Sequence, residues 1–146
     1  MKKVILCLIL VFNVGFSLDF DKALDGCIVK SDEKSCLNLS SYLEKECEKG
    51  NEAKCFLFAD MLQRGLGVEK DVVRAFDIFN KGCENNVSES CYEASVHYLE
   101  GKGTSHSFEG STTTLLKACD LGSKRACQIL TYLRSEERRV GKECRS

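Results

Sequence analysis

The strongest constraint on the fold is a cysteine pattern that repeats every 36 residues. Three pairs recur in the same register, each with seven residues between its members: Cys47 and Cys55, Cys83 and Cys91, Cys119 and Cys127. Cys27 and Cys36 form a fourth pair with one residue more between them. A period of this length is typical of one helix-turn-helix unit in an α-solenoid. The pattern therefore predicts an all-α, α/α superhelical solenoid.

The residues between the cysteines read as such a unit. A helix over residues 55–64 contains no breaker and ends at Gly65 and Gly67, because glycine accepts the left-handed conformation that closes a helix. Asp71 stands where an N-cap carboxylate would accept free backbone N–H groups of the next helix. The residues after it form one apolar stripe at helical spacing: Val72, Ala75, Phe76 and Phe79.

Two further helices follow from the same spacing. A helix beginning near Ser88 continues an apolar stripe from Cys91 through Ala94, Tyr98 and Leu99. Between Cys36 and Cys47 there are only 10 residues, whereas the full repeats have 27 between the corresponding cysteines. The Gly-rich turn is missing there, so one continuous helix is expected to carry Leu39, Tyr42, Leu43 and Cys47.

The cysteine pairs are interpreted as structural. Each pair falls at the last turn of one helix and the first turn of the next, where a disulfide would lock the elbow. Structural zinc sites favour two to four residues between paired ligands, and the only histidines, His97 and His106, lie away from the pairs. The C-x-x-C spacing of thiol redox enzymes is absent. No metal or other cofactor is expected.

The N-terminus predicts export. Lys2 and Lys3 form a short basic region before the apolar run 4–14, and Gly15 to Ser17 supply small residues for a cleavage site. Residues 1–17 are therefore interpreted as a secretory signal peptide, with a secreted or periplasmic product that has no membrane segment after cleavage. The run is too short for a bilayer-spanning helix.

Residues 134–146 look foreign to the rest of the chain. They resemble the in-frame translation of a DNA-sequencing adapter, and are expected to be a non-native tail behind a repeat domain of residues 18–133 that continues in the natural protein. That domain has 14 basic and 19 acidic residues and eight cysteines, an even number that suits four disulfides. Its acidic balance, without a basic stripe, argues against a nucleic-acid partner.

One repeat also carries a recognisable motif. The pattern G-x-G-V-x-x-D-x-x-x-A, set by Gly65, Gly67, Asp71 and Ala75, is similar to the signature of Sel1-like repeats. Together with the cysteine pairs, it resembles the Helicobacter cysteine-rich protein family of secreted Sel1-like repeat proteins. The resemblance implies an α/α superhelix with a disulfide in each repeat.

Two functions remain open. The resemblance implies a β-lactamase or penicillin-binding protein, acting on a β-lactam or cell-wall peptide. The residues do not support this hydrolase, because the single S-x-x-K at residues 31–34 lacks the companion motifs, and Ser31 or Asp32 is better interpreted as a helix N-cap. No catalytic residue is assigned. The solenoid architecture favours a scaffold that binds a peptide or protein segment in its concave groove.

A glycosylation sequon is a smaller signal. Asn86, Val87 and Ser88 form N-x-S, with Glu84 two residues before the asparagine, in an expected exposed turn. The acid at that position resembles the form used in Campylobacter-type glycosylation. The plainer interpretation is a polar turn.

Overall fold

The computed structural model describes residues 19–143, and every regular element in this range is a helix. The predicted signal peptide lies outside the described residues. The helices run in the order α2 (Phe20–Ile28), α3 (Glu33–Glu48), α4 (Glu52–Arg64), α5 (Val72–Glu84), α6 (Ser88–Glu100), α7 (Phe108–Asp120) and α8 (Lys124–Glu143).

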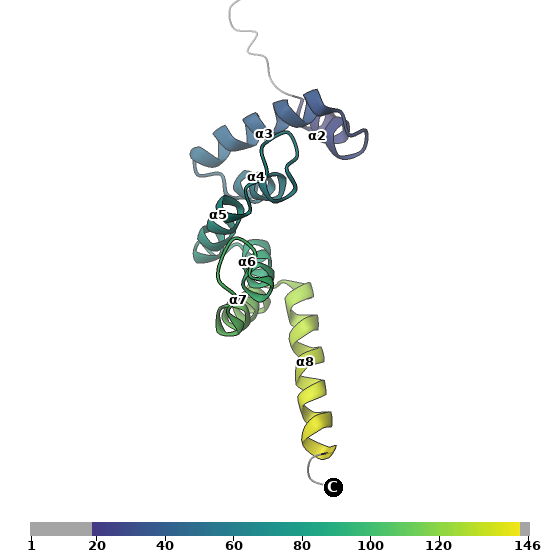
Figure 1. Cartoon of the computed structure of the whole chain (residues 1–146), viewed down its shortest axis with the longest axis vertical. Helices are drawn as coiled ribbons and strands as arrows, with labels where there is room; N and C mark the ends of the chain where they lie inside the picture. Colours follow the sequence, from purple (N-terminus) through teal and green to yellow (C-terminus); the bar gives the residue numbers. More distant parts are fainter. Residues whose placement is uncertain (1–18, 144–146) are drawn as a thin grey trace, which may run out of the picture.

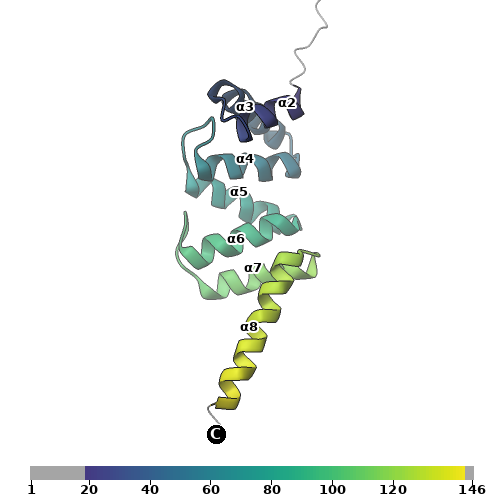
Figure 2. The ribbon, with the colours of Figure 1, turned by 90° about the vertical axis from the view of Figure 1, so that its right-hand side faces the viewer.

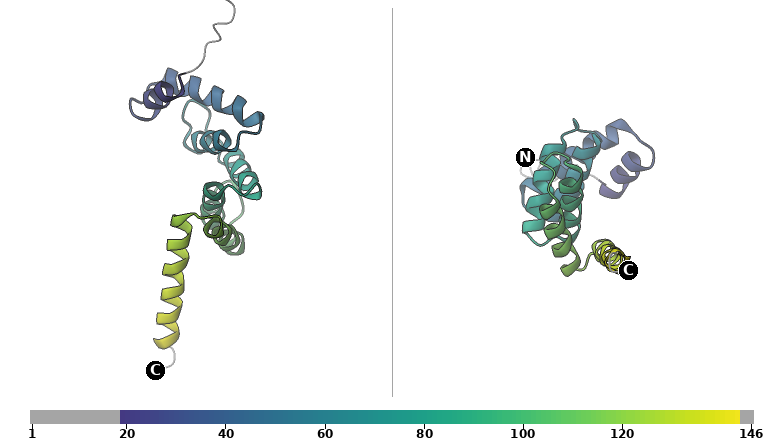
Figure 3. Two further views of the ribbon diagram at one scale, coloured as in Figure 1. Left: turned by 180° about the vertical axis from the view of Figure 1, so that it is seen from behind. Right: turned by 60° about the horizontal axis from the view of Figure 1, so that its bottom comes forward.

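The helices stack in sequence order, each against the next, along the long axis of the molecule (Figures 1 and 2). Helices α4 to α7 lie roughly perpendicular to this axis, whereas α8 runs along it and extends away from the stack (Figure 2). The view from behind and the view from below both show α8 standing apart from the other helices beyond its first turns (Figure 3). The predicted all-α solenoid is confirmed.

Side-chain caps fix most helix starts. Asp71 is the N-cap of α5, where its Oδ1 accepts from the Arg74 N–H at 2.9 Å, and Asp32 is the N-cap of α3. Gly65 closes α4 in the left-handed conformation, with a φ of 72°. Helix α3 is one unbroken helix of 16 residues, as the shortened cysteine spacing predicts.

Gly67 lets two successive units touch backbone to backbone. A Cβ at this position would lie 2.1 Å from the carbonyl carbon of Cys36, so only glycine fits beside α3. The Gly67 carbonyl then accepts a hydrogen bond from Ser40 Oγ at 2.6 Å. Gly103 repeats the arrangement one unit later, where a Cβ would lie 2.2 Å from the Val72 oxygen. Each Gly-rich loop thus docks on the helix start of the preceding unit.

The core follows the predicted stripe with one exception. Ala75 and Phe79 are fully buried in α5, and Ala94 is fully buried in α6. The assignment of Leu99 to the stripe is wrong, since half of its surface is exposed. At about 100° per residue, Leu99 is rotated roughly 140° from Ala94 and therefore faces away from the core. His97 is buried instead.

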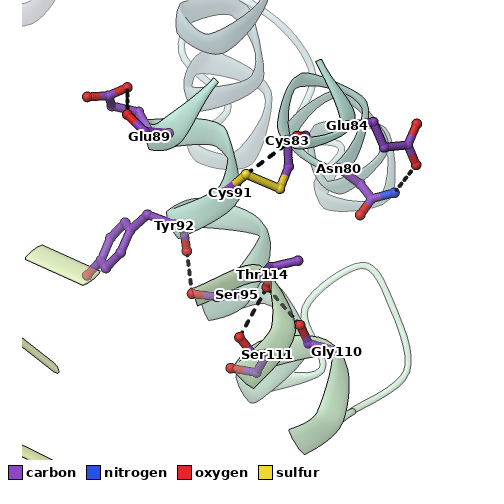
Figure 4. Close-up of a disulfide and its surroundings, with 11 residues drawn as sticks. Asn80, Cys83, Glu84, Glu89, Cys91, Tyr92, Ser95, Gly110, Ser111 and Thr114 are labelled. Atoms are coloured by element: carbon purple, nitrogen blue, oxygen red, sulfur yellow. Dashed lines mark hydrogen bonds between the residues drawn. A yellow bond between two sulfur atoms is a disulfide. The ribbon is translucent and has the colours of Figure 1, made fainter. Parts of the chain in front are cut away.

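Four disulfides join neighbouring helices, and all four are those expected: Cys27–Cys36, Cys47–Cys55, Cys83–Cys91 and Cys119–Cys127. Each spans the tight turn between two helices, and Figure 4 shows the Cys83–Cys91 bridge between α5 and α6. Four disulfides indicate an oxidising, extracytoplasmic compartment. In the described part of the chain, no helix has the length and apolarity needed to cross a membrane.

Helix α8 has an apolar surface that the rest of the protein leaves open. Ile129, Tyr132 and Leu133 are all more than a third exposed, and α8 packs mainly against α7. The helix continues through residue 133 to Glu143, so the expected domain boundary at residue 133 stays a prediction.

This packing predicts uneven hydrogen exchange. The amides of residues 127–133 should exchange faster than those of residues 55–99, because their helix is covered on one side only. Exchange followed by mass spectrometry on the oxidised protein measures the difference. Equal protection of the two segments would contradict this interpretation.

Candidate functional site

A pocket of about 500 Å³ opens between α4, α6 and the turn that connects α7 to α8. Its lining combines two aromatic rings with charges of both signs: Phe56, Glu89, Tyr92, Glu93, Gly122, Ser123, Lys124 and Arg125. Pockets of 300 to 1,000 Å³ with apolar walls and a few polar groups are typical of ligand sites.

The repeat itself places the two aromatic rings. Phe56 and Tyr92 are 36 residues apart, so they occupy equivalent positions of consecutive units, one turn into α4 and α6. The Phe56 ring is anchored against Phe79, with the centroids 5.6 Å apart. The Tyr92 side chain points away from the Cys83–Cys91 bridge and toward α8 (Figure 4). The same face of successive units therefore presents an aromatic ring to the pocket.

Glu89 and Glu93 are one helical turn apart on α6 and share its pocket side. Burial, and next the negative charge of Asp60 on α4, raise the pKa of Glu93 above its usual range. The Asp60 carboxylate is itself paired with Arg64 at 3.1 Å. Within residues 19–143, Glu93 has no hydrogen bond or ion pair of its own. A half-buried, unpaired carboxylate thus faces the pocket.

Cations stand at the mouth of the same pocket. Lys124 and Arg125 begin α8 and are both exposed. The Arg125 guanidinium lies 5.8 Å from the Tyr92 ring centroid, and its charge partly offsets the rise in the Glu93 pKa. The arrangement suits a ligand that offers both charged and apolar groups, as a peptide does.

Two polar groups, Gln63 and His97, lie between this site and the interior. Gln63 Nε2 donates to Asp60 Oδ1 at 2.9 Å, and Gln63 Oε1 lies 3.3 Å from His97 Nε2. His97 Nδ1 donates to the Lys102 carbonyl at 2.8 Å, which holds the start of the Gly-rich loop after α6. The histidine ring packs between Phe76 and Phe79, with centroid distances of 6.0 and 5.5 Å. His97 therefore acts as a packing and loop-holding residue.

The burial of His97 predicts a pH-dependent stability. Burial lowers the pKa of His97, so the folded protein keeps the ring neutral where the unfolded chain, with a pKa near 6.5, binds a proton. Below that pH the unfolded state holds more protons, so the free energy of unfolding falls as pH falls, by up to about 1.4 kcal/mol per pH unit. Above pH ~6.5 this contribution is complete.

Urea unfolding at a series of pH values between 5 and 7.5 measures this slope. His97→Gln should flatten the slope by about one proton, whereas His106→Gln, at the exposed second histidine, should leave it unchanged. An unchanged slope in His97→Gln would show that another group causes the pH dependence.

A second pocket, of about 280 Å³, lies beside the Cys47–Cys55 bridge, between α3, the start of α4 and α5. Its arginine is already engaged inside the protein, because Arg74 contacts Glu44 at 2.6 Å and lies 5.1 Å from the Phe58 ring. This pocket is therefore a less open binding site than the one at Glu93.

The residues singled out by sequence mostly build the scaffold. The eight cysteines bridge neighbouring helices, and four further residues cap helices or allow close packing: Gly65, Gly67, Asp71 and Ala75. None of these twelve residues lines the larger pocket. Asn86 is exposed in the turn between α5 and α6, with a φ of 64°. Its sequon is thus accessible, and glycosylation there stays a prediction.

The S-x-x-K segment gives no support for acyl transfer. Ser31 sits exposed in the turn before α3 with a φ of 54°, and Asp32 caps that helix through Ser35. No base is hydrogen-bonded to Ser31 among the described residues. Residues 19–143 also contain no cluster of three histidine, cysteine or acidic side chains able to hold a metal.

Sequence reasoning missed the pocket residues Phe56, Tyr92, Glu93 and Arg125. The 36-residue register could have revealed the equivalent aromatic rings, because each follows the second cysteine of its pair directly. It could not have revealed the pocket, which depends on the angle at which α8 leaves the stack.

Comparison with solved structures identifies the architecture. Cysteine-rich protein B of Helicobacter pylori matches with a TM-score of 0.59 and 24% identity, over 79% of this chain and 99% of that protein. A Sel1 repeat protein from Oxalobacter formigenes gives 0.58 and 22% over 64% of this chain, and c5321, a protective antigen of uropathogenic Escherichia coli, gives 0.66 and 18% over 81%.

The chain spans about a third of the Oxalobacter protein (36%) and a quarter of the Escherichia coli protein (25%). No family model and no curated protein sequence matches it. At these identities the structural matches establish the fold alone. The chain therefore has a Sel1-like repeat fold, with a disulfide in each of its helix pairs.

Proposed function

We propose that this protein is a secreted or periplasmic scaffold that binds a peptide or protein segment in the pocket between α4, α6 and the start of α8. The observation that carries the proposal is the pair of equivalent aromatic residues, Phe56 and Tyr92, that open into one pocket with the unpaired Glu93. Aromatic rings supply contact area at small entropic cost, and charged groups at the rim select orientation.

The disulfides support this role by making the site rigid. Cys91 precedes Tyr92 directly, Cys55 precedes Phe56, and Cys127 closes the turn that carries Arg125. A site that is already ordered loses less entropy when it binds, which favours affinity. Solenoids use this principle when they present a row of side chains from successive units.

Export is consistent with the similar structures. The Escherichia coli protein of the same fold is described as a protective antigen, which suits exposure outside the cytoplasm. The four disulfides of this chain support an oxidising compartment independently of that similarity. We infer a partner that is present in the periplasm or at the cell exterior.

Peptide display on the oxidised protein tests the proposal. A random peptide library should yield binders that are lost in Glu89→Trp, because an indole at this exposed rim position fills the pocket. The matched control Glu109→Trp, exposed on α7 outside the pocket, should retain them. No enrichment, or binders that survive Glu89→Trp, would contradict the proposed site.

A further inference from the structure

The fold repeatedly sets a cation against an aromatic face. Lys54 Nζ lies 3.3 Å from the Phe20 ring centroid. The Arg74 guanidinium lies 5.1 Å from the Phe58 ring and pairs with Glu44, so that cation, ring and carboxylate form one complete group. Both arrangements are filled by the protein's own side chains.

The larger pocket contains aromatic rings and a carboxylate as well, but here the carboxylate has no ion-pair partner. Tyr92 and Phe56 supply rings, and Glu93 supplies a carboxylate that pairs with no described side chain. Arg125 reaches the Tyr92 ring at 5.8 Å but forms no ion pair with Glu93. Arg125, Arg64 and Lys102 act on the Glu93 carboxylate only through longer-range charge, so what this group lacks is a cation paired directly with Glu93 and in contact with a ring.

Resting on the proposed function, we propose that this pocket selects peptides with a lysine or arginine side chain, which inserts between Phe56 and Tyr92 and pairs with Glu93. The cation is attracted to the ring faces as well as to the carboxylate. The rest of the peptide then crosses the mouth of the pocket near Lys124 and Arg125.

The positions of the charged side chains, at the mouth or inside the pocket, determine whether a cationic or an anionic ligand side chain is favoured. Lys124 and Arg125 are exposed at the mouth, so water and salt screen them, whereas Glu93 is partly buried inside. Asp60 adds a second negative charge near Glu93, and the positive charges of Arg64 and Lys102 offset it only in part, so the pKa of Glu93 stays raised. An anionic side chain in the pocket would face Glu93 at low dielectric, so a cationic one is favoured.

The same geometry makes Glu93 costly to the free protein. A carboxylate that is half-buried and repelled by Asp60 is destabilising when ionised, and a ligand cation would relieve this. Glu93→Gln should therefore raise the melting temperature of the ligand-free protein at neutral pH while it weakens cation binding. A residue with only a structural role would lower the melting temperature when replaced.

Two blocked, fluorescently labelled nonapeptides test the inference. Both consist of alanine, glycine and serine around a central residue, which is arginine in one and its neutral isostere citrulline in the other. By fluorescence polarisation, the arginine peptide should bind the oxidised protein about tenfold or more tightly than the citrulline peptide. Glu93→Gln should remove this preference, and Glu109→Gln, exposed on α7, should keep it.

The outcomes separate the two proposals. Equal binding of both peptides, lost in Glu89→Trp, would overturn the cation preference and leave a peptide-binding groove. A preference that persists in Glu93→Gln, or a lower melting temperature in that variant, would also overturn the role of Glu93. Failure of both peptides to bind at about 1 mM would overturn the inference, while the display selection decides the groove independently.

Discussion

Reduction of the four disulfides is expected to unfold the protein at about 25 °C. Each bridge closes a loop of eight or nine residues, which is worth roughly 2–3 kcal/mol by loop-closure entropy. Together the bridges contribute about 10 kcal/mol, which is comparable to the whole stability of an ordinary domain. A single-layer stack of helices has a small core, so it cannot replace this contribution.

Far-ultraviolet circular dichroism before and after reduction and alkylation measures the effect. The control is protein treated with the alkylating agent alone, which should remain helical because the eight cysteines of its helix pairs are bridged. Mild reduction should open Cys47–Cys55 and Cys119–Cys127 before Cys83–Cys91, whose two residues are buried. Retention of full helicity and a cooperative melt in the reduced sample would contradict the central role of the bridges.

Gly67→Ala is expected to lower the free energy of unfolding by about 4 kcal/mol. Part of this loss comes from the left-handed backbone, since φ is 62° at this position. The larger part comes from the new Cβ, which would lie 2.1 Å from the Cys36 carbonyl carbon and push the loop off α3. The hydrogen bond from Ser40 to the Gly67 carbonyl would be lost with it.

Gly50→Ala separates these two causes. Gly50 also has a positive φ, of 87°, but a Cβ there meets nothing within 4 Å. This variant should lose only the backbone part, about 1–2 kcal/mol. Denaturant unfolding of both variants gives the comparison, and equal losses would show that the loop does not depend on close backbone approach.

The elements could be predicted from the sequence because they depend on local signals at a fixed period. Asp71 as a helix cap and Gly65 as a helix end are set by the backbone groups next to them. The cysteine spacing predicts both the helix pairs and their bridges. Leu99 departs from the expected stripe because an apolar residue five positions after Ala94 faces away from the core at about 100° per residue.

Roles that depend on packing between units were not predictable. Gly67 was interpreted as a helix terminator, and its contact with Cys36 lies 31 positions away in sequence. His97 has no sequence signal that distinguishes a buried ring held by the Lys102 carbonyl from a surface one. The raised pKa of Glu93 depends partly on Asp60, which lies on a different helix, α4, and the sequence alone does not show that the two residues are close.

The most direct test of the account is to map, by nuclear magnetic resonance on the oxidised, isotopically labelled protein, where a peptide selected by display binds. Amide shift changes should cluster at residues 56, 89–93 and 122–125, around the pocket of α4, α6 and α8. Shift changes that cluster instead at Glu44, Arg74 and Lys81, around the smaller pocket, would contradict it.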